Sequence, residues 1–188
     1  MTASALAGSH AFWITSRAAG IVALLLAGAS VGVGVSIGGR LIRGRGPDLR
    51  TIHEALSLAA IVALIVHVAS LLGDSYFHAS IADLTIPFVR NYREPYMAIG
   101  IIAGWSLVVL GLSYYVRERI GIARWKVLHR FTALAWLLGV IHTVGEGSDA
   151  GKTWFLVVVA LGVIPVLGLV VARVFGSAGR SAASTTAA

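Results

Sequence analysis

Five apolar segments, each long enough to cross a lipid bilayer, account for most of this 188-residue chain. They lie at about residues 12–37, 53–73, 96–116, 127–144 and 153–175. Charged residues make up 12% of the sequence, against roughly 25% in a soluble domain. At about 20 residues per helical span, the chain has room for five or six transmembrane helices and for no separate soluble domain. We therefore predict an all-α membrane protein with one domain at 1–175 and a disordered tail at 176–188.

Basic residues cluster at one side of these segments. The regions 40–50 and 117–130 and the C-terminal end hold 11 of the 15 Lys and Arg residues. This pattern predicts an N-terminus outside and a C-terminus in the cytoplasm, and it explains the net charge of +7 without nucleic acid. A competing interpretation makes segment 12–37 a cleaved signal peptide. Arg17 is the only basic residue before the long apolar run, so we expect the segment to be retained.

Two of the segments each contain two histidines. His53 and His67 are 14 residues apart, and His129 and His142 are 13 apart. A polar ring in hydrocarbon needs a partner. Because the second and fourth spans run in the same direction, His53 lies level with His129 and His67 with His142, the two levels being about 20 Å apart. Paired imidazoles at two levels are typical axial ligands of haem iron, so we predict two stacked b-type haems.

Helical phase fits one histidine pair better than the other. A spacing of 14 residues places His53 and His67 within about 40° of each other, whereas 13 residues place His129 and His142 about 140° apart. The sequence therefore predicts a local irregularity within residues 129–145, for which Gly139 is one candidate.

Other residues near the two levels could support such cofactors. Arg124 and Arg130 flank His129, and Arg17 lies near the outer level, where cations could meet haem propionates. The alternatives are that Arg17 only snorkels to the interface and that the inner arginines are topology signals. The hydroxyls of Ser57, Ser70 and Thr132 could bond the imidazoles or their own helix backbone. We predict no catalytic acid, base or nucleophile, because cofactors would carry the chemistry. The absence of cysteine excludes thiolate ligands, iron–sulfur clusters and covalently attached haem.

The histidine spacing of 14 and then 13 resembles the ferric reductase-like transmembrane domain family. That family includes the haem domain of NADPH oxidases, the ferric reductases and the membrane subunit of bacterial methionine sulfoxide reductase systems. Supporting matches lie at 13–20, at 124–129 and in the loop 145–149. The resemblance implies a bacterial-type plasma-membrane protein that binds two haems b through His53, His67, His129 and His142. Within these 188 residues we expect no flavin and nicotinamide domain of the kind that larger members carry, and five spans where several relatives have six.

The leading hypothesis is therefore the electron-transfer subunit of an oxidoreductase. Electrons would enter at the His53/His129 level from a separate reductase, a flavoprotein or quinol. They would leave from the His67/His142 level to an outer acceptor protein or a small oxidant. Two alternatives stay open: a haemless transporter or ion pathway lined by histidines, and a membrane anchor for a partner enzyme.

Overall fold

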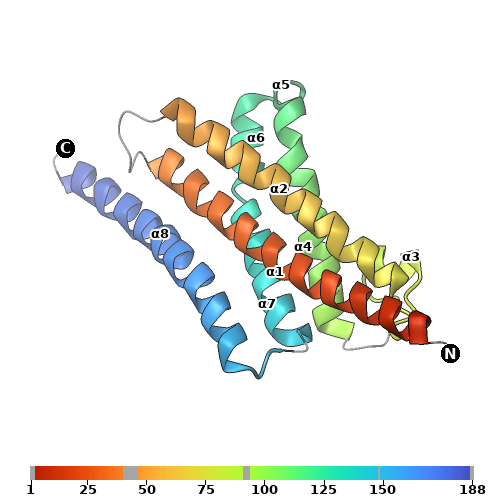
Figure 1. The fold of residues 1–188 in the computed structure, drawn as a ribbon. Helices are drawn as coiled ribbons and strands as arrows, with labels where there is room; N and C mark the ends of the chain where they lie inside the picture. Colours follow the sequence, from red (N-terminus) through yellow and green to blue (C-terminus); the bar gives the residue numbers. More distant parts are fainter. Residues whose placement is uncertain (1–2, 40–45, 91–93, 148, 187–188) are drawn as a thin grey trace.

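A computed structural model describes the backbone of residues 3–39, 46–90, 94–147 and 149–186 (Figure 1). Over these residues the chain forms helices and no strand, which confirms the all-α prediction. The elements are α1 (Ala3–Gly39), α2 (Gly46–Gly73), α3 (Ile81–Thr85), α4 (Glu94–Leu112), the 3₁₀ helix η1 (Ser113–Val116), α5 (Arg117–Ile120), α6 (Ile122–His129), α7 (Thr132–Glu146) and α8 (Thr153–Thr186).

Five stretches of the described chain are long and apolar enough to cross a membrane, which confirms the five expected spans. They are His10–Gly39, Pro47–Gly73, Glu94–Ile120, Ile122–Glu146 and Thr153–Arg173. Helix α8 continues past residue 176, where the sequence predicts a disordered tail, to Thr186. Residues 40–45 of the expected basic loop lie outside the described residues, and the orientation and the domain division stay predictions.

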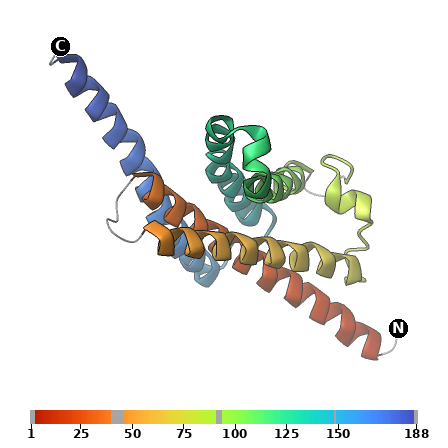
Figure 2. The same ribbon diagram turned by 90° about the horizontal axis from the view of Figure 1, so that it is seen from above.

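The helices pack mainly as two antiparallel pairs. The most extensive contact is between α1 and α2, the next is between α4 and α7, and α8 lies against α1. Figure 2 shows α1, α2 and α8 on one side of the bundle and α4 to α7 on the other. Within the described chain, α2 is not closely packed against α6 or α7. Helix α2, which carries His53 and His67, thus belongs to one group, and α6 and α7, which carry His129 and His142, belong to the other.

A small core holds α7 against α1. Trp136 is 2% exposed, and its indole N–H donates to the carbonyl of Leu24 at 3.2 Å. The ring lies over Gly28, where an added Cβ would come within 3.0 Å of the indole nitrogen. Around it pack further buried side chains from α1, α2 and α8, namely Leu24, Ala27, Val31, Ala60 and Val166. Many other large apolar side chains point outward, as expected where lipid rather than water is the solvent.

The predicted irregularity between His129 and His142 is confirmed. Helix α6 ends at His129 and α7 begins at Thr132. Between them the bonds shorten to the i→i−3 type, from Arg130 N–H to the Val127 carbonyl at 3.2 Å and from Phe131 N–H to the Leu128 carbonyl at 3.0 Å. A 3₁₀ turn rotates the chain by about 20° more per residue than an α-helix, so a few such residues remove roughly half of the expected 140° mismatch. The distortion lies directly after His129 and not at Gly139, which is inside α7.

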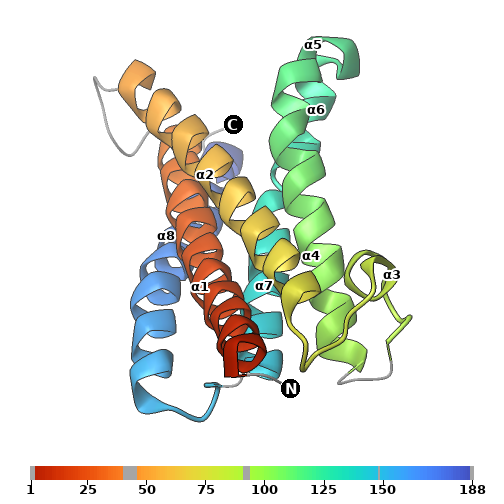
Figure 3. The same ribbon diagram turned by 45° about the vertical axis from the view of Figure 1, so that its right-hand side comes forward.

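The connection from α2 to α4 is held by polar contacts. The buried Asp74 carboxylate accepts from Tyr76 N–H at 2.8 Å. Ser80 and Asp83 form a capping box at the start of α3. The indole of Trp105, on α4, donates to the Thr85 carbonyl at 2.9 Å. This bond ties α3 to α4, and Figure 3 shows α3 lying beside α4.

Candidate functional site

The ring of His67 is held by helix α1. Its Nδ1 lies 2.8 Å from the Ser16 carbonyl and 3.1 Å from the Ser16 hydroxyl, and this hydroxyl donates to the His67 carbonyl at 3.1 Å. A carbonyl can only accept, so Nδ1 carries the proton and the lone pair is on Nε2. The ring rests on Gly20, where an added Cβ would lie 3.0 Å from Nδ1.

His53 repeats this arrangement one level away. Its Nδ1 lies 2.9 Å from the Ser30 carbonyl and 3.0 Å from the Ser30 hydroxyl, and its ring rests on Gly34. The two serines are 14 residues apart, as are the two glycines and the two histidines. Because the spacing on α1 equals the spacing on α2, each of the two histidine rings contacts one serine and one glycine of α1 in the same way.

The other two histidines bond backbone carbonyls of α4. His142 Nδ1 donates to the Tyr96 carbonyl at 2.8 Å, and its ring covers Gly100. His129 Nδ1 donates to the Leu110 carbonyl at 3.3 Å. Trp125 stacks on the His129 ring with centroids 4.9 Å apart. All four histidines thus share one tautomer, with Nδ1 as donor and Nε2 left as acceptor.

The structure brings the histidines together across the join between the two helix groups. The rings of His53 and His129 have centroids 5.9 Å apart and planes at 85°. His67 and His142 are near enough to interact electrostatically. Near the first pair, the Tyr115 hydroxyl donates to Glu54 at 2.8 Å and joins η1 to α2. Among the described residues, no group of three or more His, Cys, Asp or Glu side chains could hold a bare metal ion.

The three arginines selected from the sequence lie at both ends of the bundle. Arg124 is in α6, and Arg130 follows His129 in the turn before α7. At the other end, the Arg17 guanidinium forms an ion pair with Asp149 and lies over the Trp13 ring at 4.1 Å.

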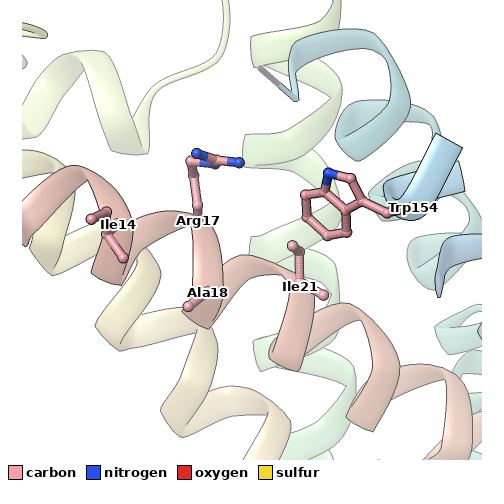
Figure 4. Close-up of a pocket in the computed structure, with 5 residues that line it drawn as sticks. All are labelled: Ile14, Arg17, Ala18, Ile21 and Trp154. Carbon is pink, nitrogen blue, oxygen red and sulfur yellow. The ribbon is translucent and has the colours of Figure 1, made fainter. Parts of the chain in front are cut away.

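Beside Arg17 is a hollow of about 230 Å³ that Ile14, Ala18 and Ile21 of α1 line together with Trp154 of α8 (Figure 4). Its lining is apolar except for Arg17, and it lies on a different face of α1 from Ser16 and Gly20. No histidine lines it.

Sequence reasoning missed the residues that hold the imidazoles. Ser57 donates to the His53 carbonyl and lies 2.7 Å from the Ser30 hydroxyl of α1. Ser70 donates to the Val66 carbonyl, and Thr132, at the start of α7, donates to the His129 carbonyl at the end of α6. These hydroxyls thus bond backbone carbonyls or another hydroxyl rather than an imidazole. The ring partners are instead Ser16 and Ser30. The signal was present in the sequence, because the motif Ser-x-x-x-Gly recurs in the first apolar segment with the 14-residue spacing of the histidines.

Comparison with known proteins identifies the family. The family described as ferric reductase like transmembrane component matches residues 19–140. This match covers more than half of the chain, and the chain therefore belongs to that family. It includes His53, His67 and His129 and ends just before His142. No curated protein gives a significant match, and neither does any solved structure.

Proposed function

We propose that this member of the ferric reductase-like transmembrane family carries electrons across the membrane on two b-type haems. Family membership indicates transmembrane electron transfer in general terms. The observations that support the finer statement are the shared tautomer of the four histidines and the facing rings of His53 and His129. One pair, His53 and His129, would hold one haem, and His67 and His142 would hold the other.

The residues present fit such a group. Metal–nitrogen bonds of about 2.0–2.1 Å would place the centroids of two imidazoles on one metal roughly 6 Å apart, and the His53 and His129 centroids are 5.9 Å apart. Each Nδ1–H is bonded to a backbone carbonyl, the usual outer partner of a metal-bound histidine. The close packing of α2 is with α1 rather than with α6 or α7, so the helices that carry the paired histidines are not tightly packed against each other.

In this proposal the histidines would hold the haems, and the arginines would balance the charge of the haem propionates. When bound, the haems would supply one-electron redox chemistry at two levels about 20 Å apart along the helix axis. The four imidazoles would hold the two haems, one pair at each level, and such bis-histidine binding would support electron transfer rather than oxygen binding. Arg124 and Arg130 supply positive charge beside His129. Arg17, paired with Asp149, supplies it at the other end.

The distribution of basic residues among the loops suggests the direction of electron transfer across the membrane. With the basic ends of the spans in the cytoplasm, His53 and His129 face a cytoplasmic reductase, a flavoprotein or quinol as donor. His67 and His142 face an outer acceptor protein or a small oxidant. The chain would then be the electron-transfer subunit of an oxidoreductase that its partners complete.

The test uses the full-length protein purified in detergent. We expect a dithionite-sensitive b-type spectrum and two haems per chain in a pyridine haemochrome assay. His67→Ala and His142→Ala should each remove the same haem, and His53→Ala and His129→Ala the other. His78→Ala, outside the spans, is the matched control and should keep both. A colourless protein, or four histidine variants with unchanged haem content, would contradict the proposal.

A further inference from the structure

Three of the four imidazoles reach a helix carbonyl that lies four residues before a glycine. Ser16 precedes Gly20, Ser30 precedes Gly34 and Tyr96 precedes Gly100 at this spacing, and each ring lies over the glycine. The three Nδ1–O distances are 2.8, 2.9 and 2.8 Å. The same offset on two different helices suggests a common physical cause.

That cause is the direction of side chains on an α-helix. A helical side chain leans toward the N-terminus and covers the turn before its own Cα. The side chain at position i+4 therefore shields the carbonyl of residue i from the side. Without that side chain, the second lone pair of the carbonyl, which the helix does not use, becomes accessible to a donor from a neighbouring helix.

The fourth histidine shows what happens without the glycine. The residue four positions after Leu110 is Tyr114, and there the α-helix has tightened into the 3₁₀ helix η1. The bond from His129 to the Leu110 carbonyl is longer, at 3.3 Å. Trp125 supports this ring by stacking on it, and its indole donates to Ser113 at 3.1 Å.

We propose, on the basis of the proposed function, that Gly20, Gly34 and Gly100 are positioning residues for the haem ligands. Each opens one helix carbonyl to one imidazole, fixes Nδ1 as the donor, and thereby turns Nε2 toward the iron. Gly34 acts on the His53/His129 level, and Gly20 and Gly100 act on the His67/His142 level.

Alanine at each glycine tests this assignment. A Cβ at Gly100 would overlap the His142 ring, and Cβ atoms at Gly20 and Gly34 would lie 3.0 and 3.1 Å from ring atoms. The matched controls are Gly32→Ala on α1 and Gly104→Ala on α4, where the nearest side-chain atoms would be at 3.7 and 3.6 Å. These are ordinary contact distances, so the controls add the same methyl group without touching an imidazole.

The readouts are haem content, the midpoint potential of each haem and its electron paramagnetic resonance spectrum, measured on the full-length protein. Histidine variants assign each signal to a level. Gly100→Ala should weaken retention of the His67/His142 haem by about tenfold or more and leave the other haem in place. Gly20→Ala should shift the potential and spectrum of that same haem, and Gly34→Ala should shift only those of the His53/His129 haem.

The retained haem in each variant reports that the chain is still folded. Glycine variants that behave like Gly32→Ala and Gly104→Ala, or that lose both haems together, would overturn the inference while the proposed function stands. A wild-type chain without haem would overturn the proposed function and this inference with it.

Discussion

At the scale of single residues, a histidine inside a membrane must satisfy both ring nitrogens. The Nδ1–H of each of the four histidines meets a main-chain carbonyl that no substitution can delete. The serine hydroxyls add a second acceptor at two of these positions, at 3.1 Å in Ser16 and 3.0 Å in Ser30. The two serine hydroxyls can therefore adjust the strength of the hydrogen bonding at Nδ1, while the backbone carbonyls provide the main acceptors.

Ser16→Ala tests this tuning at His67. Removal of the hydroxyl leaves Nδ1–H with one acceptor, which makes the imidazole a weaker electron donor to the metal. On the proposed function, we expect the midpoint potential of the haem that His67 and His142 would hold to become more positive, with unchanged haem content. Ser16→Thr should keep the wild-type potential. Ser36→Ala is the control, since that hydroxyl donates to the Gly32 carbonyl of its own helix. Equal potentials in Ser16→Ala and Ser36→Ala would rule out the tuning role.

Asp83 gives a second residue-scale prediction. The Ser80 backbone N–H and hydroxyl bond its carboxylate, and with Arg90 they hold the pKa of Asp83 below its ordinary value of 3.8. A carboxyl with a lowered folded pKa stabilises the fold above its unfolded pKa, and this contribution is lost as pH falls through the folded value. We expect the protection of residues 81–86 against hydrogen exchange, relative to the intrinsic rate at each pH, to fall only below about pH 4. In Asp83→Asn this protection should be low at all pH values, and a loss of protection near pH 6 in the wild-type chain would contradict the assignment.

At the scale of elements, the sequence predicts most of what is regular. Five long apolar runs predict five spans, because the membrane leaves a buried backbone few alternatives. The 13-residue spacing of His129 and His142 predicts an irregularity, because helical geometry cannot otherwise place both rings on one side. The position of this irregularity, directly after His129, could not be predicted. It involves a hydrogen bond from the Thr132 hydroxyl to the His129 carbonyl, and helix propensities do not describe such a bond. The contacts of His53 and His67 with serine and glycine residues of α1 were also missed, because they depend on which helix α2 packs against.

The hydroxyl of Thr132 supports this break in the helix. It donates to the His129 carbonyl at 2.7 Å, where the regular hydrogen-bond ladder is interrupted. Thr132→Val should leave that carbonyl poorly satisfied and lower stability by about 1–3 kcal/mol, as measured by thermal unfolding in detergent. Thr143→Val is the control, because Thr143 bonds the Gly139 carbonyl within a continuous helix. Equal destabilisation by both changes would mean that the break needs no side-chain support.

At the scale of the whole molecule, both histidine pairs depend on the packing of one helix group against the other. Trp136 lies between His129 and His142 in sequence and joins α7 to α1 through Leu24 and Gly28. Trp136→Ala should cost about 3–5 kcal/mol of stability, because it empties the largest buried side-chain volume in the described core. Because this contact joins the two helix groups, we expect the change to weaken retention of both proposed haems together, unlike a glycine variant that affects one level. Trp105→Ala, which removes an indole that is 53% exposed, should keep both. Haem content and thermal unfolding measure these effects, and loss of a single haem in Trp136→Ala would show that the two levels are held independently.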